Sequence, residues 1–221
     1  MIMPAKNPMD ELREEMVRTQ IATRGIRDEK VLEAMRKVPR EIFVPENLRR
    51  EAFADHPLPI GHAQTISQPY IVALMTEMLE AAENAPLRIL DVGTGSGYQA
   101  AVLAWLGHYV VSIERVRECA ENAERDLGEA GLADSVEIHV GDGCDGYPQK
   151  APFDRAVISA ATPKPPEKIL EQLKPGGILV APIGSPHIQR LVKMRKRMDG
   201  AFEAEPGIQC RFVPLIGEDA F

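Results

Sequence analysis

The sequence predicts an α/β fold with a mostly parallel sheet, an N-terminal helical segment and a C-terminal antiparallel hairpin. A glycine-rich turn at residues 93–97 joins the apolar run 87–90 to a helical stretch, and a second apolar run then ends in Glu114. Apolar runs and helical stretches keep alternating through the second half of the chain. Strand, glycine turn, helix, strand and acid form half of a Rossmann-like, nucleotide-binding fold. A chain of 221 residues is expected to fold as one domain, with a helical and loop segment at 1–84 and the α/β core at 85–221.

Three helices are expected before the glycine turn: residues 9–24, a helix that runs from its cap Asp28 to residue 38, and residues 70–82. Apolar side chains recur at helical spacing in the first and third of them. Gly25 ends the first helix, Pro39 stops the second, and Pro69 suits the first turn of the third. Residues 41–63 contain prolines and lack a period, so this stretch is expected to be irregular.

Five strands and three helices are expected from residue 87 to residue 182. The strands are at 88–92, 109–114, 136–140, 155–159 and 178–182, and the helices are at 99–106, 117–130 and 166–173. Two further runs flank Asp199-Gly200, which is a strong signal for a hairpin with a two-residue turn. Basic and apolar residues alternate over 190–197, which favours a solvated edge strand there.

Charge and composition argue against several classes of protein. The net charge of -7 argues against a broad nucleic-acid-binding surface. No apolar run approaches the ~18 residues of a membrane-spanning helix, and the N-terminus has no signal-peptide core. Cys119, Cys144 and Cys210 lack metal-ligand spacing, so no metal site is expected and the three are interpreted as free thiols of a cytoplasmic protein. The oligomeric state is left open.

The spacing of the glycines decides which nucleotide is expected. A dinucleotide fingerprint reads G-x-G-x-x-G, but Tyr98 stands where its last glycine belongs. The turn has no arginine or lysine for a pyrophosphate, and the Gly-Lys-Ser/Thr of a Walker loop is absent. The pattern Gly93-x-Gly95-x-Gly97 resembles motif I of the S-adenosylmethionine-dependent methyltransferases, and this resemblance implies their fold and their cofactor. A tight turn without any ligand is the alternative.

Acidic residues suit such a cofactor, because it carries a sulfonium cation and no phosphate. Asp91 lies at the end of the strand before the turn, and Glu114 ends the next strand, where its carboxylate suits the hydroxyl donors of a ribose. Asp142 follows the third strand, where these enzymes commonly place an acid for the adenine amino group. The residues that the resemblance predicts for cofactor binding are Asp91, Gly93, Thr94, Gly95, Gly97, Glu114, Asp142 and Gly143.

The segment at 57–70 narrows the family. It reads PLPIGHAQTISQPY and is similar to the signature of the protein-L-isoaspartate (D-aspartate) O-methyltransferases, with residues 64–69 as the most specific part. Ala63 departs from the family pattern, which often has glycine there, and this puts the detailed shape of the loop in doubt. Residues 25–217 carry the resemblance, with further similar stretches at 38–44, 95–99, 141–143 and 211–215.

The resemblance implies a protein repair reaction, in which a methyl group passes from S-adenosylmethionine to the free carboxylate of an L-isoaspartyl residue in a damaged protein or peptide. A carboxylate is already ionised at neutral pH, so the enzyme needs no strong base and has to position its reactants. Ser67 matches the family's active-site serine and is the candidate for orienting the carboxylate. Its competing role is a cap for the following helix. Gln64, Thr65 and Val213 are expected to line the substrate pocket.

Two other classes of function remain open. One is an S-adenosylmethionine-dependent methyltransferase of a small molecule or RNA, and the other is a non-catalytic binding module. Cys144 does not follow a proline, and residues 159–162 replace the Asn/Asp-Pro-Pro-aromatic sequence of many nucleic-acid methyltransferases. Both absences argue against a DNA or RNA substrate, so the expected partners are isoaspartyl-containing proteins, with neither nucleic acid nor membrane.

Overall fold

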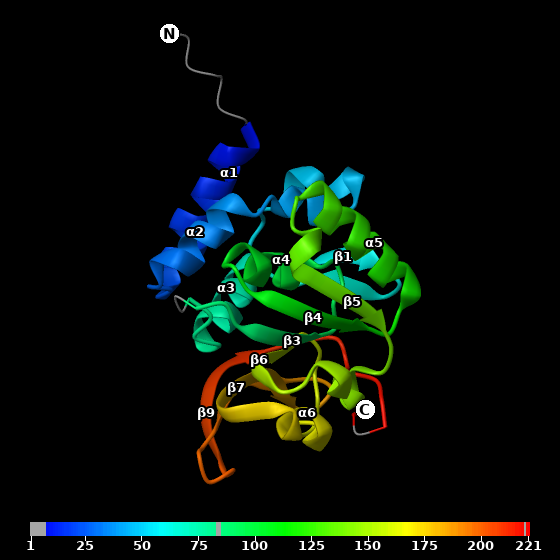
Figure 1. Ribbon diagram of the computed structural model, residues 1–221. Helices are drawn as coiled ribbons and strands as arrows, with labels where there is room; N and C mark the ends of the chain where they lie inside the picture. The colour runs from blue at the N-terminus through cyan, green and yellow to red at the C-terminus, as the bar shows by residue number, and fades with distance from the viewer. Residues whose placement is uncertain (1–7, 83–84, 219) are drawn as a thin grey trace.

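The central sheet has seven strands in the order β5-β4-β3-β6-β7-β8-β9 in this computed structural model, which describes residues 8–82, 85–218 and 220–221 (Figure 1). The strands are β3 (Arg88–Val92), β4 (Tyr109–Glu114), β5 (Val136–Val140), β6 (Phe153–Ile158), β7 (Leu173–Gly184), β8 (Gln189–Lys196) and β9 (Phe202–Cys210). The pairs from β5 to β7 are parallel, and β8 and β9 are antiparallel. The chain therefore leaves β3 toward β4 on one side and later returns to β6 on the other. Open α/β sheets bind ligands at the carboxyl ends of the strands around such a switch point.

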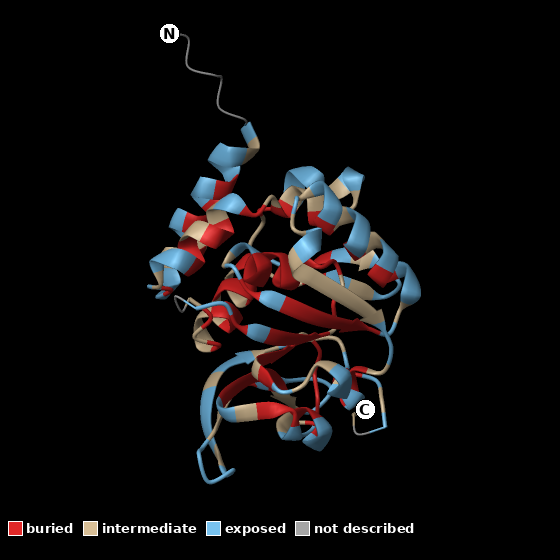
Figure 2. Cartoon of the chain, viewed as in Figure 1, coloured by how far each residue is buried: buried red, intermediate tan, exposed pale blue. Residues whose placement is uncertain are grey.

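Helices cover both faces of the sheet. They are α3 (Pro69–Met78), α4 (Tyr98–Trp105) and α5 (Arg117–Glu129) on one face, and α6 (Glu167–Glu171) on the other (Figure 1). Side-chain alternation along β3 accounts for the two layers. Ile89 packs in one cluster with Met75 of α3 and Leu103 of α4. The next residue, Leu90, packs in another cluster with Ile169 of α6. Figure 2 shows the buried residues concentrated in the central strands and on the inner sides of the helices.

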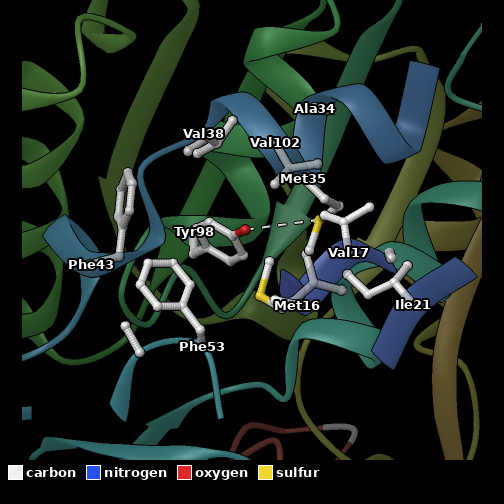
Figure 3. Packing of buried hydrophobic residues seen from close by; sticks show 14 of the residues in the cluster. Met16, Val17, Ile21, Ala34, Met35, Val38, Phe43, Phe53, Tyr98 and Val102 are labelled. Carbon is white, nitrogen blue, oxygen red and sulfur yellow. Dashed lines mark hydrogen bonds between the residues drawn. The ribbon is translucent and has the colours of Figure 1, made fainter. Parts of the chain in front are cut away.

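The N-terminal segment packs onto α4 through an apolar cluster. The segment comprises α1 (Pro8–Met16), a π-helical turn (Val17–Ile21), a 3-10 turn (Ala22–Arg24), α2 (Glu29–Lys37) and two 3-10 helices (Arg40–Phe43 and Glu46–Glu51). Met16, Met35 and Phe43 join Tyr98 of α4 in this cluster, and the Tyr98 hydroxyl contacts the Met35 sulfur at 3.8 Å (Figure 3). The N-terminal helices and α4 therefore share one buried core.

The helix expected at residues 9–24 is helical throughout, but it is not one regular α-helix. It passes from α to π to 3-10 geometry before Gly25 ends it with φ of 98°. The hydroxyls of Thr19 and Thr23 donate to the carbonyl oxygens of Glu15 and Thr19, at 2.7 and 2.6 Å. Such back-bonding often bends helices. The predicted cap of α2 is confirmed, since Asp28 accepts hydrogen bonds from two backbone amides of the first turn.

The prediction that residues 41–63 are irregular is wrong in part. This stretch contains the two 3-10 helices and β1 (Leu58–Gly61), which pairs with β2 (Gln64–Ile66) in a short antiparallel hairpin. Its two turn residues, His62 and Ala63, have φ of 50° and 57°. Left-handed pairs of this kind are the favoured hairpin turns, but they usually contain Asn, Asp or Gly. The sequence therefore lacks the usual signal for this turn.

Two element boundaries differ from the expectation by more than two residues. The third helix ends at Met78 rather than at residue 82. β7 begins at Leu173, five residues before the expected strand, because Leu173 pairs with Phe153 before the register shifts. Gly176, with φ of 79°, lies within this irregular stretch. The glycines that precede the expected strand thus belong to the strand itself.

The C-terminal hairpin is confirmed, but its turn is longer than expected. The Arg197 amide donates to the Ala201 carbonyl at 2.7 Å and the Gly200 amide to the Arg197 carbonyl at 3.1 Å, so the turn has three residues. Gly200 takes φ of 87°, as the last residue of such a turn requires.

The prediction of an edge strand at residues 190–197 is wrong. β8 lies between β7 and β9, and β9 forms the edge of the sheet. Two of its basic side chains, Lys193 and Arg195, pair with the Glu80 carboxylate at 2.7 and 2.5 Å. An inner strand whose basic side chains pair with carboxylates therefore shows the same alternation of basic and apolar residues as a solvated edge strand.

Replacing Ala63 with glycine should raise the free energy of unfolding by roughly 0.5–1 kcal/mol. A side chain in the left-handed region costs about 1–2 kcal/mol, and the extra entropy of glycine in the unfolded chain offsets part of the gain. Urea unfolding of the wild type and the variant measures the difference. Ala130→Gly is the matched control, because Ala130 has φ of -77° and its replacement should lower stability. A less stable Ala63→Gly protein would contradict the left-handed assignment.

Candidate active site

A cavity of about 400 Å³ opens at the carboxyl ends of β3, β4 and β6. We call it the cofactor cleft. Its floor is the glycine turn between β3 and α4, and Glu114 at the tip of β4 forms part of one wall. The β1–β2 hairpin with the residues after it, and residues 213–216 after β9, also line the cleft. The cleft therefore lies where the topology of the sheet places a ligand site.

The glycine turn has the backbone conformation that the sequence argument requires. Gly93, Gly95 and Gly97 have φ of 89°, 53° and 86°. The Gly97 position is also crowded, because a Cβ there would lie 3.1 Å from the Cβ of Ala123 on α5. The amides of Gly93 and Thr94 both donate to the Ile113 carbonyl, which fixes the turn against β4.

Glu114 joins the wall of the cleft to its floor. Its carboxylate accepts a hydrogen bond from the Gly95 amide and another from the Val116 amide, both at 2.8 Å. The residue is only 6% exposed, yet it lines the cleft. A buried carboxylate with two backbone donors is held rigidly and can still accept hydrogen bonds from a ligand.

Asp91 lies behind the glycine turn and does not line the cleft. The Ser112 hydroxyl, across the strand pair, donates to Asp91 Oδ2 at 2.7 Å, and the hydroxyls of Ser112 and Thr94 are 2.6 Å apart. Asp91 Oδ1 has no hydrogen-bond partner among the described residues. Burial, together with the nearby charge of Glu114, raises the pKa of Asp91 to about 7, while the Ser112 hydrogen bond opposes the shift. Asp91 therefore supports the turn through Ser112 and Thr94.

Gly143 lines the cleft, but Asp142 does not. The Asp142 carboxylate caps a 3-10 turn, accepting a hydrogen bond from the Cys144 amide at 2.9 Å. It faces a separate shallow cavity that Arg115 and Gly217 also line. A Cβ at position 143 would lie 2.5 Å from Cγ1 of Val92, so the site requires the close approach that glycine allows.

A second cavity of about 270 Å³ adjoins the cofactor cleft, and we call it the side groove. Thr65, Ser67, Ser159 and Val213 line both cavities, so the two spaces meet at these four residues. Gln64 lines the cofactor cleft only. Three of the four shared residues carry hydroxyl groups. The junction is therefore a place where a group in the groove can approach a group in the cleft.

Ser159 is the shared residue that the sequence did not reveal as a site residue. It directly follows β6, and its amide donates to the Val92 carbonyl at the end of β3, at 2.8 Å. Its place at the carboxyl end of a strand beside β3 is the signal that could have found it. The comparison of motifs used residues 159–162 only as evidence against a nucleic-acid methyltransferase, because that family's motif is lacking there.

A buried arginine anchors the backbone of Ser67. Arg40 donates to the Ser67 carbonyl and to the Ala52 carbonyl, both at 2.7 Å, and its guanidinium lies 4.8 Å from the centre of the Tyr98 ring. Burial lowers the pKa of Arg40 to about 10, so the side chain remains charged at neutral pH. Burial also raises the pKa of Tyr98 to about 12.

The Ser67 hydroxyl is available at the junction. The N-cap of α3 is Gln68, and its side chain makes no capping bond. Within the part of the chain that the structure describes, the Ser67 hydroxyl makes no hydrogen bond of its own. Its competing role as a helix cap is therefore not seen.

Two further features bear on the kind of protein. Among the described residues, no helix is long and apolar enough to span a membrane. Nor do three or more His, Cys, Asp or Glu side chains, within the same residues, come together in a way that could hold a metal ion.

Comparisons with known proteins agree on one family. The family model of protein-L-isoaspartate(D-aspartate) O-methyltransferase matches residues 11–220. Protein-L-isoaspartate O-methyltransferases from Methanoculleus marisnigri and Methanospirillum hungatei are each 53% identical to this chain. The matches cover 96% of this chain and 94% of the first relative, and 93% of both chains for the second.

Solved structures show the same fold. A protein-L-isoaspartate O-methyltransferase superposes with a TM-score of 0.82 and 27% identity, over 96% of this chain and 67% of the other. A Plasmodium falciparum structure, solved in complex with S-adenosyl-L-homocysteine, has a TM-score of 0.80 and 24% identity, over 96% of this chain and 99% of the other.

Proposed function

Because this chain belongs to the protein-L-isoaspartate(D-aspartate) O-methyltransferase family, we propose that Ser67 orients an isoaspartyl carboxylate where the side groove meets the cofactor cleft. The chain is an S-adenosylmethionine-dependent protein carboxyl methyltransferase that acts on isoaspartyl residues of damaged proteins. The observation that carries the assignment of the junction is the set of four residues that line both cavities.

The cleft suits S-adenosylmethionine. Glu114 is the acid that lines it in the described part of the chain, and the glycine turn lets the backbone approach a ligand closely. The arginine that lines the cleft in the described part of the chain, Arg115, already donates a hydrogen bond to the Ile216 carbonyl at 3.1 Å. When bound, the cofactor supplies a methyl group activated by its sulfonium. We assign the ribose hydroxyls to Glu114, and the floor of the site to Gly93, Thr94, Gly95 and Gly143. Gly97 does not line the cleft and supports the turn where it packs against α5.

Asp91 and Asp142 take supporting roles in this assignment. The Asp91 carboxylate holds the turn from behind, and that of Asp142 caps its own turn. Both acids remain predicted to support cofactor binding, and they would do so through the turns that their carboxylates stabilise.

The chemistry at the junction suits an ionised carboxylate. A carboxylate in the groove needs hydrogen bonds that orient it, while a salt bridge would lower its nucleophilicity. Thr65, Ser67 and Ser159 offer neutral hydroxyls there, and no lysine or arginine is shared by the two cavities among the described residues. Val213 supplies an apolar wall, which strengthens the electrostatic interactions near it by excluding water. Gln64 remains a predicted substrate contact from the cleft side.

The broader setting of the enzyme stays a prediction. Cys119 and Cys144 are buried and form no disulfide within the described residues, which fits the cytoplasm proposed from the sequence. Proteins and peptides with isoaspartyl residues are the proposed partners, and the net charge of -7 argues against nucleic acid.

A panel of acceptors tests the proposed function. The purified chain receives labelled S-adenosylmethionine with an isoaspartyl peptide, with RNA, or with small carboxylic acids. We expect label on the isoaspartyl peptide, and we expect mild base to release it as volatile methanol, because the product is a methyl ester. Label on RNA or on a small molecule, with none on the peptide, would favour the alternative methyltransferase.

Replacing Glu114 with alanine should weaken the binding of S-adenosylmethionine by about ten-fold or more. Hydrogen bonds to a charged acceptor contribute about 1.5–3 kcal/mol each, and the Gly95 amide also loses its partner. Calorimetry measures the affinity, and circular dichroism checks the fold. Glu118→Ala is the control, because it removes the same charge from an exposed position nearby that does not line the cleft. Unchanged affinity in Glu114→Ala would remove Glu114 from the site.

A further inference from the structure

The side groove has an unusual charge for this protein. Two arginines, Arg24 and Arg211, line it, and no carboxylate does so among the residues that the structure describes. The whole chain carries a net charge of -7. A local positive site on an acidic protein attracts negatively charged ligand groups to that one place.

Arg24 is largely neutralised and held in place. Its guanidinium lies 5.0 Å from the centre of the Tyr70 ring and is ion-paired with Asp55. The side-chain amide of Gln68 also donates to the Asp55 carboxylate, at 2.7 Å. Arg24 therefore forms a fixed wall of the groove and contributes little free charge.

Arg211 carries the charge that is left over. It is exposed, and in the described part of the chain it makes no hydrogen bond or ion pair. Its backbone is well placed, because the next amide, that of Phe212, donates to Gln189 Oε1 at 2.9 Å. The carbonyl of Val213 accepts a hydrogen bond from the Ala161 amide at 2.7 Å. The backbone that carries this unpaired arginine is thus fixed two residues from Val213, which lies at the junction.

We propose that Arg211 makes the enzyme prefer isoaspartyl peptides that carry an acidic side chain close to the isoaspartyl residue. The proposal rests on the proposed function, since it assigns the groove to the substrate chain. The flanking carboxylate pairs with the free guanidinium of Arg211, whereas a flanking lysine is repelled. Because the pair is exposed to solvent, the preference is about three- to five-fold in kcat/KM for each charge, and it weakens as salt is added.

Three matched isoaspartyl peptides test this preference. They differ only in the residue next to the isoaspartyl position, which is Glu, Gln or Lys, and each is made with the change on the N-terminal and on the C-terminal side. For the wild type we expect kcat/KM to fall in the order Glu, Gln, Lys on at least one side. Arg211→Gln should remove the order, and Arg211→Glu should reverse it. Arg50→Glu is the control, because it makes the same charge change at an exposed residue that lines neither cavity, and it should keep the wild-type order.

The outcomes separate this inference from the proposed function. Equal kcat/KM for all three peptides with the wild type would overturn the inference and leave the function standing. A preference that survives in Arg211→Gln, or is lost equally in Arg50→Glu, would also overturn it. Methylation of none of the isoaspartyl peptides would instead contradict the proposed function. Ratios between peptides are compared within each variant, so a partial loss of folded protein does not alter the result.

Discussion

Replacing Gly95 with valine should abolish the binding of S-adenosylmethionine, with a loss in affinity of at least about 100-fold. Gly95 has φ of 53°, and a β-branched residue is strongly disfavoured there. The added Cβ would make only an ordinary contact with Cδ1 of Ile60, at 3.7 Å, so the expected loss comes from the backbone strain. A turn that relaxes to a negative φ also loses the hydrogen bond from the Gly95 amide to Glu114. Calorimetry measures the affinity.

A second glycine provides the control for backbone strain. Gly131 has φ of 70°, a Cβ added there would meet no other atom within 4 Å, and the residue does not line the cleft. Gly131→Val should therefore lower stability and leave cofactor affinity nearly unchanged. If Gly95→Val kept its affinity, or crystals of it held the cofactor in an unchanged turn, the role assigned to the glycines would be wrong.

Replacing Ser67 with alanine should lower the turnover of isoaspartyl peptide by about ten-fold or more, with cofactor affinity nearly intact. The loss of one hydrogen bond in the transition state, about 1.4 kcal/mol, corresponds to that factor. A helix cap would instead contribute roughly 0.5–2 kcal/mol to stability and nothing to turnover. Since Gln68 is the N-cap of α3, we expect little change in melting temperature.

Rate and melting are measured on one preparation of Ser67→Ala. Ser135→Ala makes the same substitution outside both cavities and should leave turnover unchanged. A destabilised Ser67→Ala enzyme with wild-type turnover would eliminate the orienting role.

The glycine turn and the parallel sheet were predictable because their signals are local. Three glycines with positive φ follow a buried strand, and Glu114 ends the next strand. Neighbouring parallel strands bring such residues together whatever the rest of the chain does. The β1–β2 hairpin was missed because His62 and Ala63 take left-handed conformations without the usual turn residues. Burial of the paired residues Leu58 and Ile66 in the core, rather than local preference at the turn, holds the hairpin in place.

The direction in which each acidic side chain points was harder to predict than the place of the residue in the fold. Asp91 is paired in register with Ser112, and its side chain therefore points behind the turn. Asp142 is drawn to the Cys144 amide of the turn that follows it. Both residues lie next to cleft residues in sequence, so a motif places them in the site while the side-chain geometry does not. Ser159 is the opposite case, because no motif places it in the site. The pairing of β6 with β3 brings it to the junction.

The most direct measurement of the central claim is labelled methyl transfer to one peptide made in aspartyl and isoaspartyl forms. The two forms have the same composition and charge, and they differ only in which carboxyl group of the residue belongs to the backbone. We predict that the isoaspartyl form is methylated and that the aspartyl form is not. Equal labelling of both forms, or labelling of the aspartyl form alone, would contradict the account.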